Sequence, residues 1–177
     1  TCDTGSTMKL ALSEVRALQP AEVRSAVSFK TGDYAPDFHA FETDNFIVKF
    51  SPGVDGVMAR EMPPLLEEMY GDVTGAMKFE PEHKTIIELM PDHASFSVRI
   101  TGNSDVYTMA ASTGPLLAME APKIGKGHMA IYDWQRVVRH EYTHTVTLAK
   151  TKNRIPVWFT EAAAVWMERG PRDYAKC

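Results

Sequence analysis

The chain has 177 residues, of which 44% are hydrophobic and 24% charged, and its formal net charge is -4. This length and balance suit a folded domain with its own core and exclude an intrinsically disordered chain. The negative charge does not favour nucleic acid as a partner, because nucleic acids select basic surfaces. No apolar run approaches the roughly 18 to 20 residues that cross a membrane, so no membrane span is expected.

Residues 1–36 are predicted to be a helical segment and a linker. Apolar spacing indicates helices over 8–19 and 20–29, and the turn-rich stretch 31–37 reads as the linker. Because the chain begins without a methionine, we expect a piece of a longer protein, with a helical or helical-repeat domain as its neighbour. Residues 37–177 are then predicted to form the main domain.

Strand and helix patterns alternate over the first half of this domain. Three stretches have strand patterns, namely residues 38–43, 45–51 and 84–90. A helix is expected between the second and the third. Its tandem prolines, Pro63 and Pro64, should break or kink it, because proline has no backbone N–H to donate.

The second half is predicted to become helical. A short helix, a loop and a strand are expected at residues 91–100, 101–114 and 116–120. Asp133 is the predicted N-cap of a long helix, and a last helix should begin near Pro156 and end by Gly170. We expect Trp134, Trp158 and Trp166 to pack these two helices together. Strands first and helices last are typical of the α+β class.

The long helix contains the run His140-Glu141-Tyr142-Thr143-His144, an HExxH motif. Residues four apart lie about one helical turn apart, so both imidazoles project from one face and can share a Zn²⁺ ion. Glu141 is offset around the helix, toward the water that such an ion binds, which suits a general base. The alternative is a helix whose two histidines are satisfied by solvent or by the core.

A catalytic zinc site needs a third protein ligand, and Glu161 is the candidate. It comes 17 positions after His144, in the next predicted helix, among neighbours that are nearly all apolar. A lone carboxylate is costly there unless it is paired or bound to a metal. The alternative is an ion pair with Arg136 or Arg139. Because HExxH supplies only two of the three protein ligands, metal binding is the favoured role for Glu161.

The segments HEYTHTVTL and NRIPVWFTEAAAVWME resemble the gluzincin metallopeptidases, and among them the peptidase MA-like group related to aminopeptidase N and thermolysin. This resemblance implies a zincin-like fold, in which a small mixed or antiparallel sheet packs on the HExxH helix. It also implies a peptide or protein substrate. The habits of the related proteins favour an extracytoplasmic location. The residues that it implies are His140, His144 and Glu161 as ligands of one Zn²⁺ ion and Glu141 as the general base.

The same resemblance implies a substrate-binding strand above the active-site helix. In gluzincins an edge strand binds extended peptide, and residues 116–122 are expected to supply it. Ala118-Met119-Glu120 is similar to part of a segment in which the glutamate binds the amino terminus of the substrate. Met119 and Glu120 are therefore expected to contact substrate. The alternative is an ordinary strand with one exposed glutamate.

Relatives also supply a Tyr or His that stabilises the oxyanion. Tyr174 is the candidate here, with Tyr132 and His128 as further ones, although each also fits a structural role. Glu168, two turns after Glu161, is a candidate partner of Arg139, and a backbone carbonyl is the alternative group that would orient His140. If the oxyanion donor is missing, the alternative function is a metal-binding but catalytically weak recognition or scaffold domain of a larger protein.

Overall fold

The computed structural model describes residues 38–51, 54–104, 106–129 and 131–170. The helices expected over 8–19 and 20–29, the linker expected over 31–37 and the candidate Tyr174 lie outside these residues. The described part forms five strands and four helices. Their order is β1 (His39–Glu42), β2 (Phe46–Phe50), α3 (Val54–Met77), β3 (Thr85–Met90), α4 (His93–Thr101), β4 (Ala110–Ser112), β5 (Leu116–Glu120), α5 (Trp134–Thr151) and α6 (Val157–Met167).

The strands form one mixed sheet with the order β1-β2-β3-β5-β4. β2, β3 and β5 run parallel, and β1 and β4 pair antiparallel at the two edges. The short, β-branched run of β3 lies at the centre, where both faces are covered, as a continuous apolar strand predicts. The expected mixed α and β fold with a small mixed sheet is confirmed for this part of the chain.

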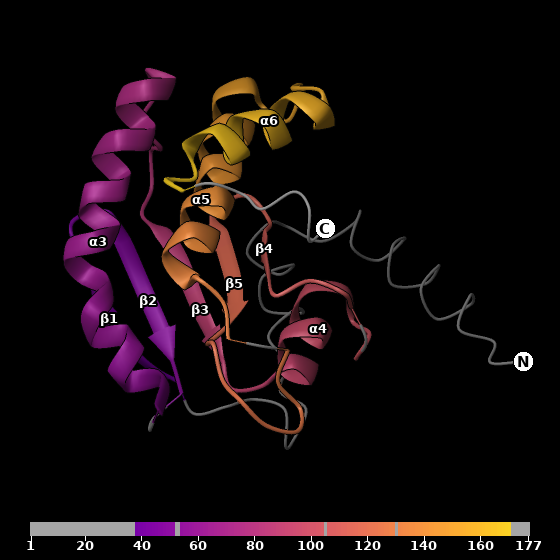
Figure 1. Cartoon of the computed structure of the whole chain (residues 1–177). Coiled ribbons are helices and arrows are strands. Elements are labelled where there is room, and N and C mark those ends of the chain that lie inside the picture. The colour runs from indigo at the N-terminus through magenta and orange to yellow at the C-terminus, as the bar shows by residue number, and fades with distance from the viewer. Residues whose placement is uncertain (1–37, 52–53, 105, 130, 171–177) are drawn as a thin grey trace, which may run out of the picture. The chain divides into compact units, whose positions relative to one another are not determined.

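Helices cover both faces of the sheet (Figure 1). α3 and α5 lie on one face and share the main core with β2, β3 and β5, whereas α4 packs on the other face. Side chains that alternate along β5 divide accordingly, because Leu117 and Met119 join the main core and Ala118 joins the α4 side. No helix within the described ranges is long and apolar enough to span a bilayer.

The predicted break at Pro63 and Pro64 is wrong, because α3 continues through both prolines for 24 residues. A proline in a helix interior removes one backbone hydrogen bond and costs on the order of 3 kcal/mol, and α3 contains two. One face of α3 is nevertheless fully buried on the sheet. That face extends on both sides of the prolines and comprises Ala59, Met62, Leu66, Met69 and Val73. Tertiary burial of this face offsets the local cost.

The strand β4 was missed by the sequence analysis, which predicted a loop over 101–114. Its three residues pair with β5 through the registers Ala110 to Met119 and Ser112 to Leu117. β4 therefore forms the edge of the sheet, and β5 is an interior strand. The expectation that residues 116–122 form the edge strand is therefore wrong. The sequence did not indicate β4, because periodicity cannot reveal a strand of three residues.

Tyr142 of α5 is the largest fully buried side chain in the described residues. Its ring packs against Phe46 and Tyr70, with ring centroids 5.2 and 6.3 Å away. Burial raises the pKa of the Tyr142 hydroxyl far above its usual value. That hydroxyl has no hydrogen-bond partner within the described part of the chain, so the ring alone stabilises the core.

Tyr142→Phe should therefore leave the free energy of unfolding unchanged or raise it by about 1 kcal/mol, because it removes a buried polar group without a partner. Tyr142→Ala should lower it by about 3 to 5 kcal/mol, because it creates a cavity beside Phe46. Chemical denaturation of both variants measures the difference. A clear loss of stability in the phenylalanine variant would show that the hydroxyl is hydrogen-bonded in the native protein.

Candidate metal centre

α5 and α6 form an antiparallel pair, and the turn between them sets how their side chains meet. Asp133 caps α5 by accepting a hydrogen bond from the Arg136 N–H, as predicted. Lys152 and Asn153 then adopt left-handed backbone angles, with φ values of 52° and 59°, and end the helix. As a result the first turn of α6 meets the middle of α5, and Glu168, just after α6, meets the first half of α5.

This pairing brings His140, His144 and Glu161 together. Their ligand atoms all lie within 4.8 Å of one another. The two Nε2 atoms are 3.1 Å apart, and each is 3.5 Å from an oxygen of the Glu161 carboxylate. Ligands about 2.0 to 2.1 Å from a tetrahedral zinc ion are themselves about 3.3 Å apart. The three side chains thus have the spacing that one such ion requires.

Exposure differs among the three side chains. His140 and His144 are 16% and 11% exposed, whereas Glu161 is 54% exposed. Burial lowers the pKa of His144, and His140 adds to this effect while Glu161 opposes it. A neutral imidazole at physiological pH is the form that binds a metal.

Glu141 lies beside this group and faces the edge of the sheet. The Ser112 backbone N–H on β4 donates a hydrogen bond to the Glu141 carboxylate. Burial raises the pKa of Glu141, and both His140 and the Ser112 hydrogen bond oppose that shift. Ser112 and Thr145 also join the two elements through their hydroxyls, which are 2.8 Å apart. Glu141 is thus held between α5 and β4 by contacts that the sequence did not indicate.

The ring of His140 is oriented by Glu168. Its Nδ1 donates a hydrogen bond to a Glu168 oxygen 2.6 Å away, and a neutral ring that donates from Nδ1 carries its lone pair on Nε2. Glu168 is only 3% exposed in its side chain, and Arg136 lies 3.6 Å from its second oxygen. A carboxylate that holds a histidine in this way is typical of metal centres.

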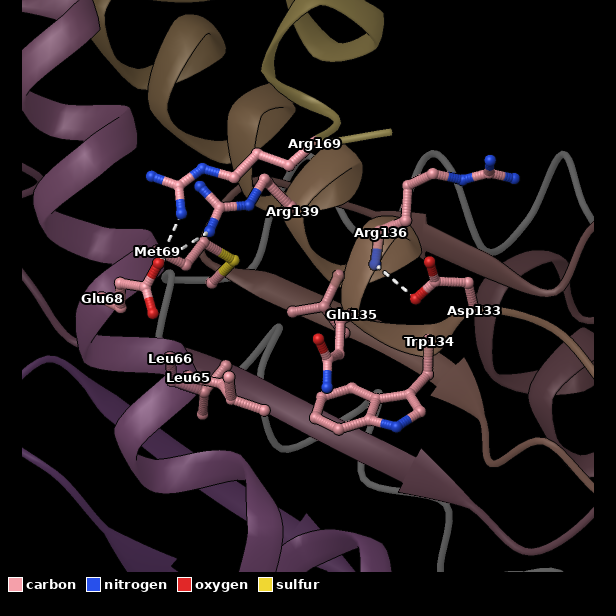
Figure 2. Close-up of a pocket in the computed structure, with 11 residues that line it drawn as sticks. Leu65, Leu66, Glu68, Met69, Asp133, Trp134, Gln135, Arg136, Arg139 and Arg169 are labelled. Carbon is pink, nitrogen blue, oxygen red and sulfur yellow. Dashed lines mark hydrogen bonds and ion pairs between the residues drawn. The ribbon is translucent and has the colours of Figure 1, made fainter. Parts of the chain in front are cut away.

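The expected pair between Glu168 and Arg139 is wrong. Arg139 instead contacts Asp72 on α3 at 2.7 Å, and Arg169 joins the same group through Glu68 and Asp72. Figure 2 shows the Arg139 and Arg169 side chains converging on Glu68. Neither Arg136 nor Arg139 pairs with Glu161, so the alternative role for that glutamate as their partner is not what the structure shows.

These arginines border a cavity of about 170 Å³ between α3 and α5 (Figure 2). Its floor is apolar and includes Leu66, Met69 and Val138. Of the α5 residues that line it, Gln135 and Val138 lie on the opposite side of the helix from His140, whereas Arg136, four residues before His140, lies on the same face and neighbours Glu168. None of the three candidate ligands lines this cavity.

Met119 and Glu120 are both fully buried, so the alternative of an exposed Glu120 is wrong. The Glu120 carboxylate accepts hydrogen bonds from His128 Nδ1 at 2.5 Å and from the Met129 N–H at 3.3 Å. Tyr132 donates its hydroxyl hydrogen bond to the Glu120 backbone carbonyl. Glu120 thus organises the segment that leads into α5, and His128 and Tyr132 are held at Glu120.

Trp158 and Trp166 do not pack the two helices together, contrary to expectation. They are 71% and 76% exposed. The face of α6 toward α5 instead carries the smaller side chains of Thr160 and Ala164. Small side chains let α6 approach α5 closely enough for Glu161 to reach the histidines.

Three contacts around these side chains were missed from the sequence, namely those of Thr160 with His144, of Glu168 with His140 and of Ser112 with Glu141. Glu168 carried a signal, because it lies seven residues after Glu161, about two helical turns, and so on nearly the same face of α6. Thr160 and Ser112 carried none, since threonine and serine are common in every kind of local structure.

Zinc binding tests the assembled group. The protein should bind one equivalent of zinc, and excess zinc should raise the melting temperature of the chelator-treated protein. When free zinc is 100 times its dissociation constant, binding adds about 2.7 kcal/mol to the free energy of unfolding. His144→Ala and Glu161→Gln should each weaken binding strongly, because each removes one of three ligands. The exposed Glu80 offers a matched control, and Glu80→Gln should bind zinc normally. Full zinc affinity in both ligand variants would contradict the assignment.

Glu168→Gln should lower zinc affinity by about 10- to 100-fold, because the amide cannot supply the charge that orients and polarises His140. Competition with a chelator of known affinity measures the change. Glu68→Gln is the control, since Glu68 also pairs with an arginine but does not contact either histidine. Equal losses in the two variants would indicate a general effect of ion pairing.

Comparisons with known proteins add no further assignment for this site. No family model matches the chain, and neither a curated protein nor a solved structure gave a significant match. What can be said of the site therefore follows from the positions of its own side chains.

Proposed function

We propose that this chain is a zinc-dependent peptidase of the gluzincin type, with a zincin-like arrangement of sheet and helices. The observation that carries this proposal is the triangle of His140 Nε2, His144 Nε2 and the Glu161 carboxylate, with sides of 3.1 to 3.5 Å. The HExxH helix packs on the sheet, and the following helix supplies the glutamate, as the resemblance to that family implies.

The residues fit a zinc ion in chemistry as well as in spacing. Two imidazoles and one carboxylate are a ligand set that catalytic zinc sites use, and they leave a position open for water or substrate. When bound, zinc supplies Lewis acidity that lowers the pKa of water and polarises a carbonyl group. The hydrogen bond from His140 Nδ1 to Glu168 suits this role, because it leaves Nε2 available for the ion.

Glu141 is the general base in this proposal. Its carboxylate neighbours His140 and is held by the Ser112 N–H at the sheet edge. It would take a proton from the attacking water and deliver it to the leaving amine. The raised pKa of Glu141, which burial causes, brings its proton affinity closer to that needed for such a transfer.

Among the described residues no strand pairs with the outer edge of β4, and this edge offers a place for the peptide backbone. The Thr113 N–H bonds to the Leu116 carbonyl, and Ala111 pairs with Ala118 in the same register. In an antiparallel pair the backbone groups of alternate residues point away from the partner strand, so those of Ala110 and Ser112 point away from β5. The Ser112 N–H is engaged by Glu141, and the remaining outward groups, the Ala110 N–H and carbonyl and the Ser112 carbonyl, can pair with an extended peptide beside Glu141.

A second candidate is metal binding without efficient hydrolysis. It is favoured by the position of Tyr132, whose hydroxyl hydrogen is donated to the Glu120 carbonyl and is not available to an oxyanion in this structure. His128 is held at Glu120 through Nδ1 alone, which leaves its Nε2 as the remaining candidate group. The third candidate for that role, Tyr174, lies outside the described residues. The two functions differ in whether the zinc-loaded protein cleaves peptides.

Cleavage of a mixed peptide library by the zinc-loaded protein and by Glu141→Gln tests the proposal. Glutamine cannot act as a base, so the variant should keep one zinc ion and lose about 100- to 10,000-fold in turnover. Mass spectrometry measures the products and metal analysis the zinc content. Equal cleavage by both proteins would exclude Glu141 as the base. Zinc binding without any cleavage would favour the second candidate.

A further inference from the structure

A chain of threonine hydroxyls begins at His144. His144 Nδ1 is 2.9 Å from Thr160 Oγ1, which is 2.8 Å from Thr147 Oγ1. Thr147 Oγ1 in turn donates a hydrogen bond to the Thr143 carbonyl at 2.8 Å. This series of hydrogen bonds thus starts on α5 at His144, passes through Thr160 of α6 and returns to α5 at Thr147, about one turn after His144.

The chemistry of its last member sets the direction of this chain. The Thr143 carbonyl can only accept, so the Thr147 hydroxyl hydrogen points to it. The Thr147 oxygen is then available to accept from Thr160, and the Thr160 oxygen to accept from His144 Nδ1. Each hydroxyl donates once and accepts once in this direction. His144 accordingly carries its hydrogen on Nδ1 and its lone pair on Nε2.

We propose that Thr160 is a positioning residue for the metal centre, and that Thr147 orients its hydroxyl. Together they hold His144 in the tautomer and ring orientation that direct the Nε2 lone pair toward His140 and Glu161. This inference rests on the metal binding within the proposed function and is independent of whether the protein cleaves peptides.

Burial of the two threonines strengthens their hold on the His144 ring. Thr160 and Thr147 are only 6% and 4% exposed, so bulk water does not readily replace a missing hydroxyl. Both side chains are β-branched, which restricts rotation about χ1 and keeps the oxygens in place.

The two histidines are therefore oriented by different chemistry. His140 has the Glu168 carboxylate, whose charge Arg136 offsets, whereas His144 has neutral hydroxyls. A hydroxyl fixes the tautomer of His144 without placing a further negative charge beside Glu161. We expect that a carboxylate at position 160 would not reproduce this arrangement.

A series of threonine variants tests the inference through zinc affinity, measured by chelator competition. Valine has the branched shape of threonine without the hydroxyl, and serine has the hydroxyl without the extra methyl group. Thr160→Val should weaken zinc binding by about 10- to 100-fold, and Thr160→Ser should bind nearly as well as the unchanged protein. Thr147→Val should cause a smaller loss, because Thr160 can still accept from His144.

Thr74→Val is the matched control, since Thr74 is a buried threonine of α3 whose hydroxyl donates to the Tyr70 carbonyl and which belongs neither to these hydrogen bonds nor to the candidate metal centre. It should leave zinc affinity unchanged. The tautomer of His144, read from ¹⁵N chemical shifts of the zinc-free protein, is a second measurement that needs neither metal nor turnover. It should be the Nδ1–H form in the unchanged protein and in Thr160→Ser.

Unchanged zinc affinity in Thr160→Val would overturn the inference, as would an Nε2–H tautomer of His144 in the unchanged protein. Equal losses in Thr160→Val, Thr160→Ser and Thr74→Val would do the same, because they would indicate a packing effect. If the protein binds zinc with the predicted order of affinities but cleaves no peptide, the positioning role stands and the peptidase proposal fails.

Discussion

The candidate site depends on the hydrogen bonds that the two histidines make away from their shared face. His140 donates from Nδ1 to Glu168, and the Nδ1 of His144 meets Thr160. Both partners lie on or next to α6, so the packing of one helix on another sets the orientation of both rings. Because Glu161 belongs to the same helix, the contacts that orient the rings also bring the third ligand to them.

The two faces of α6 carry side chains of different size. Small side chains face α5, and the large aromatic side chains Trp158 and Trp166 face outward. This distribution reverses the usual rule that large apolar side chains are inside. It is explained on the inner side by the need for Glu161 to lie within 3.5 Å of both imidazoles.

The two arginines of α5 have different partners. Arg139 belongs to a network with Asp72, Glu68 and Arg169 that ties α5 to α3 and to the end of α6. Arg136 neighbours Glu168 instead. Both arginines border the cavity, but only Arg136 also adjoins the candidate metal centre. Neither pairs with Glu161, whose carboxylate is directed at the histidines.

The sequence alone determined what depends on local spacing. The four-residue separation of His140 and His144, the cap at Asp133 and the β-branched run of β3 each have a helical or extended period that neighbouring residues set. Only the tertiary structure decided the short strand β4, the unbroken helix through Pro63 and the partners of the two imidazoles. These features arise from contacts between residues far apart in the chain, whose burial outweighs local preference. Of them only Glu168, by its spacing from Glu161, carried a signal in the sequence.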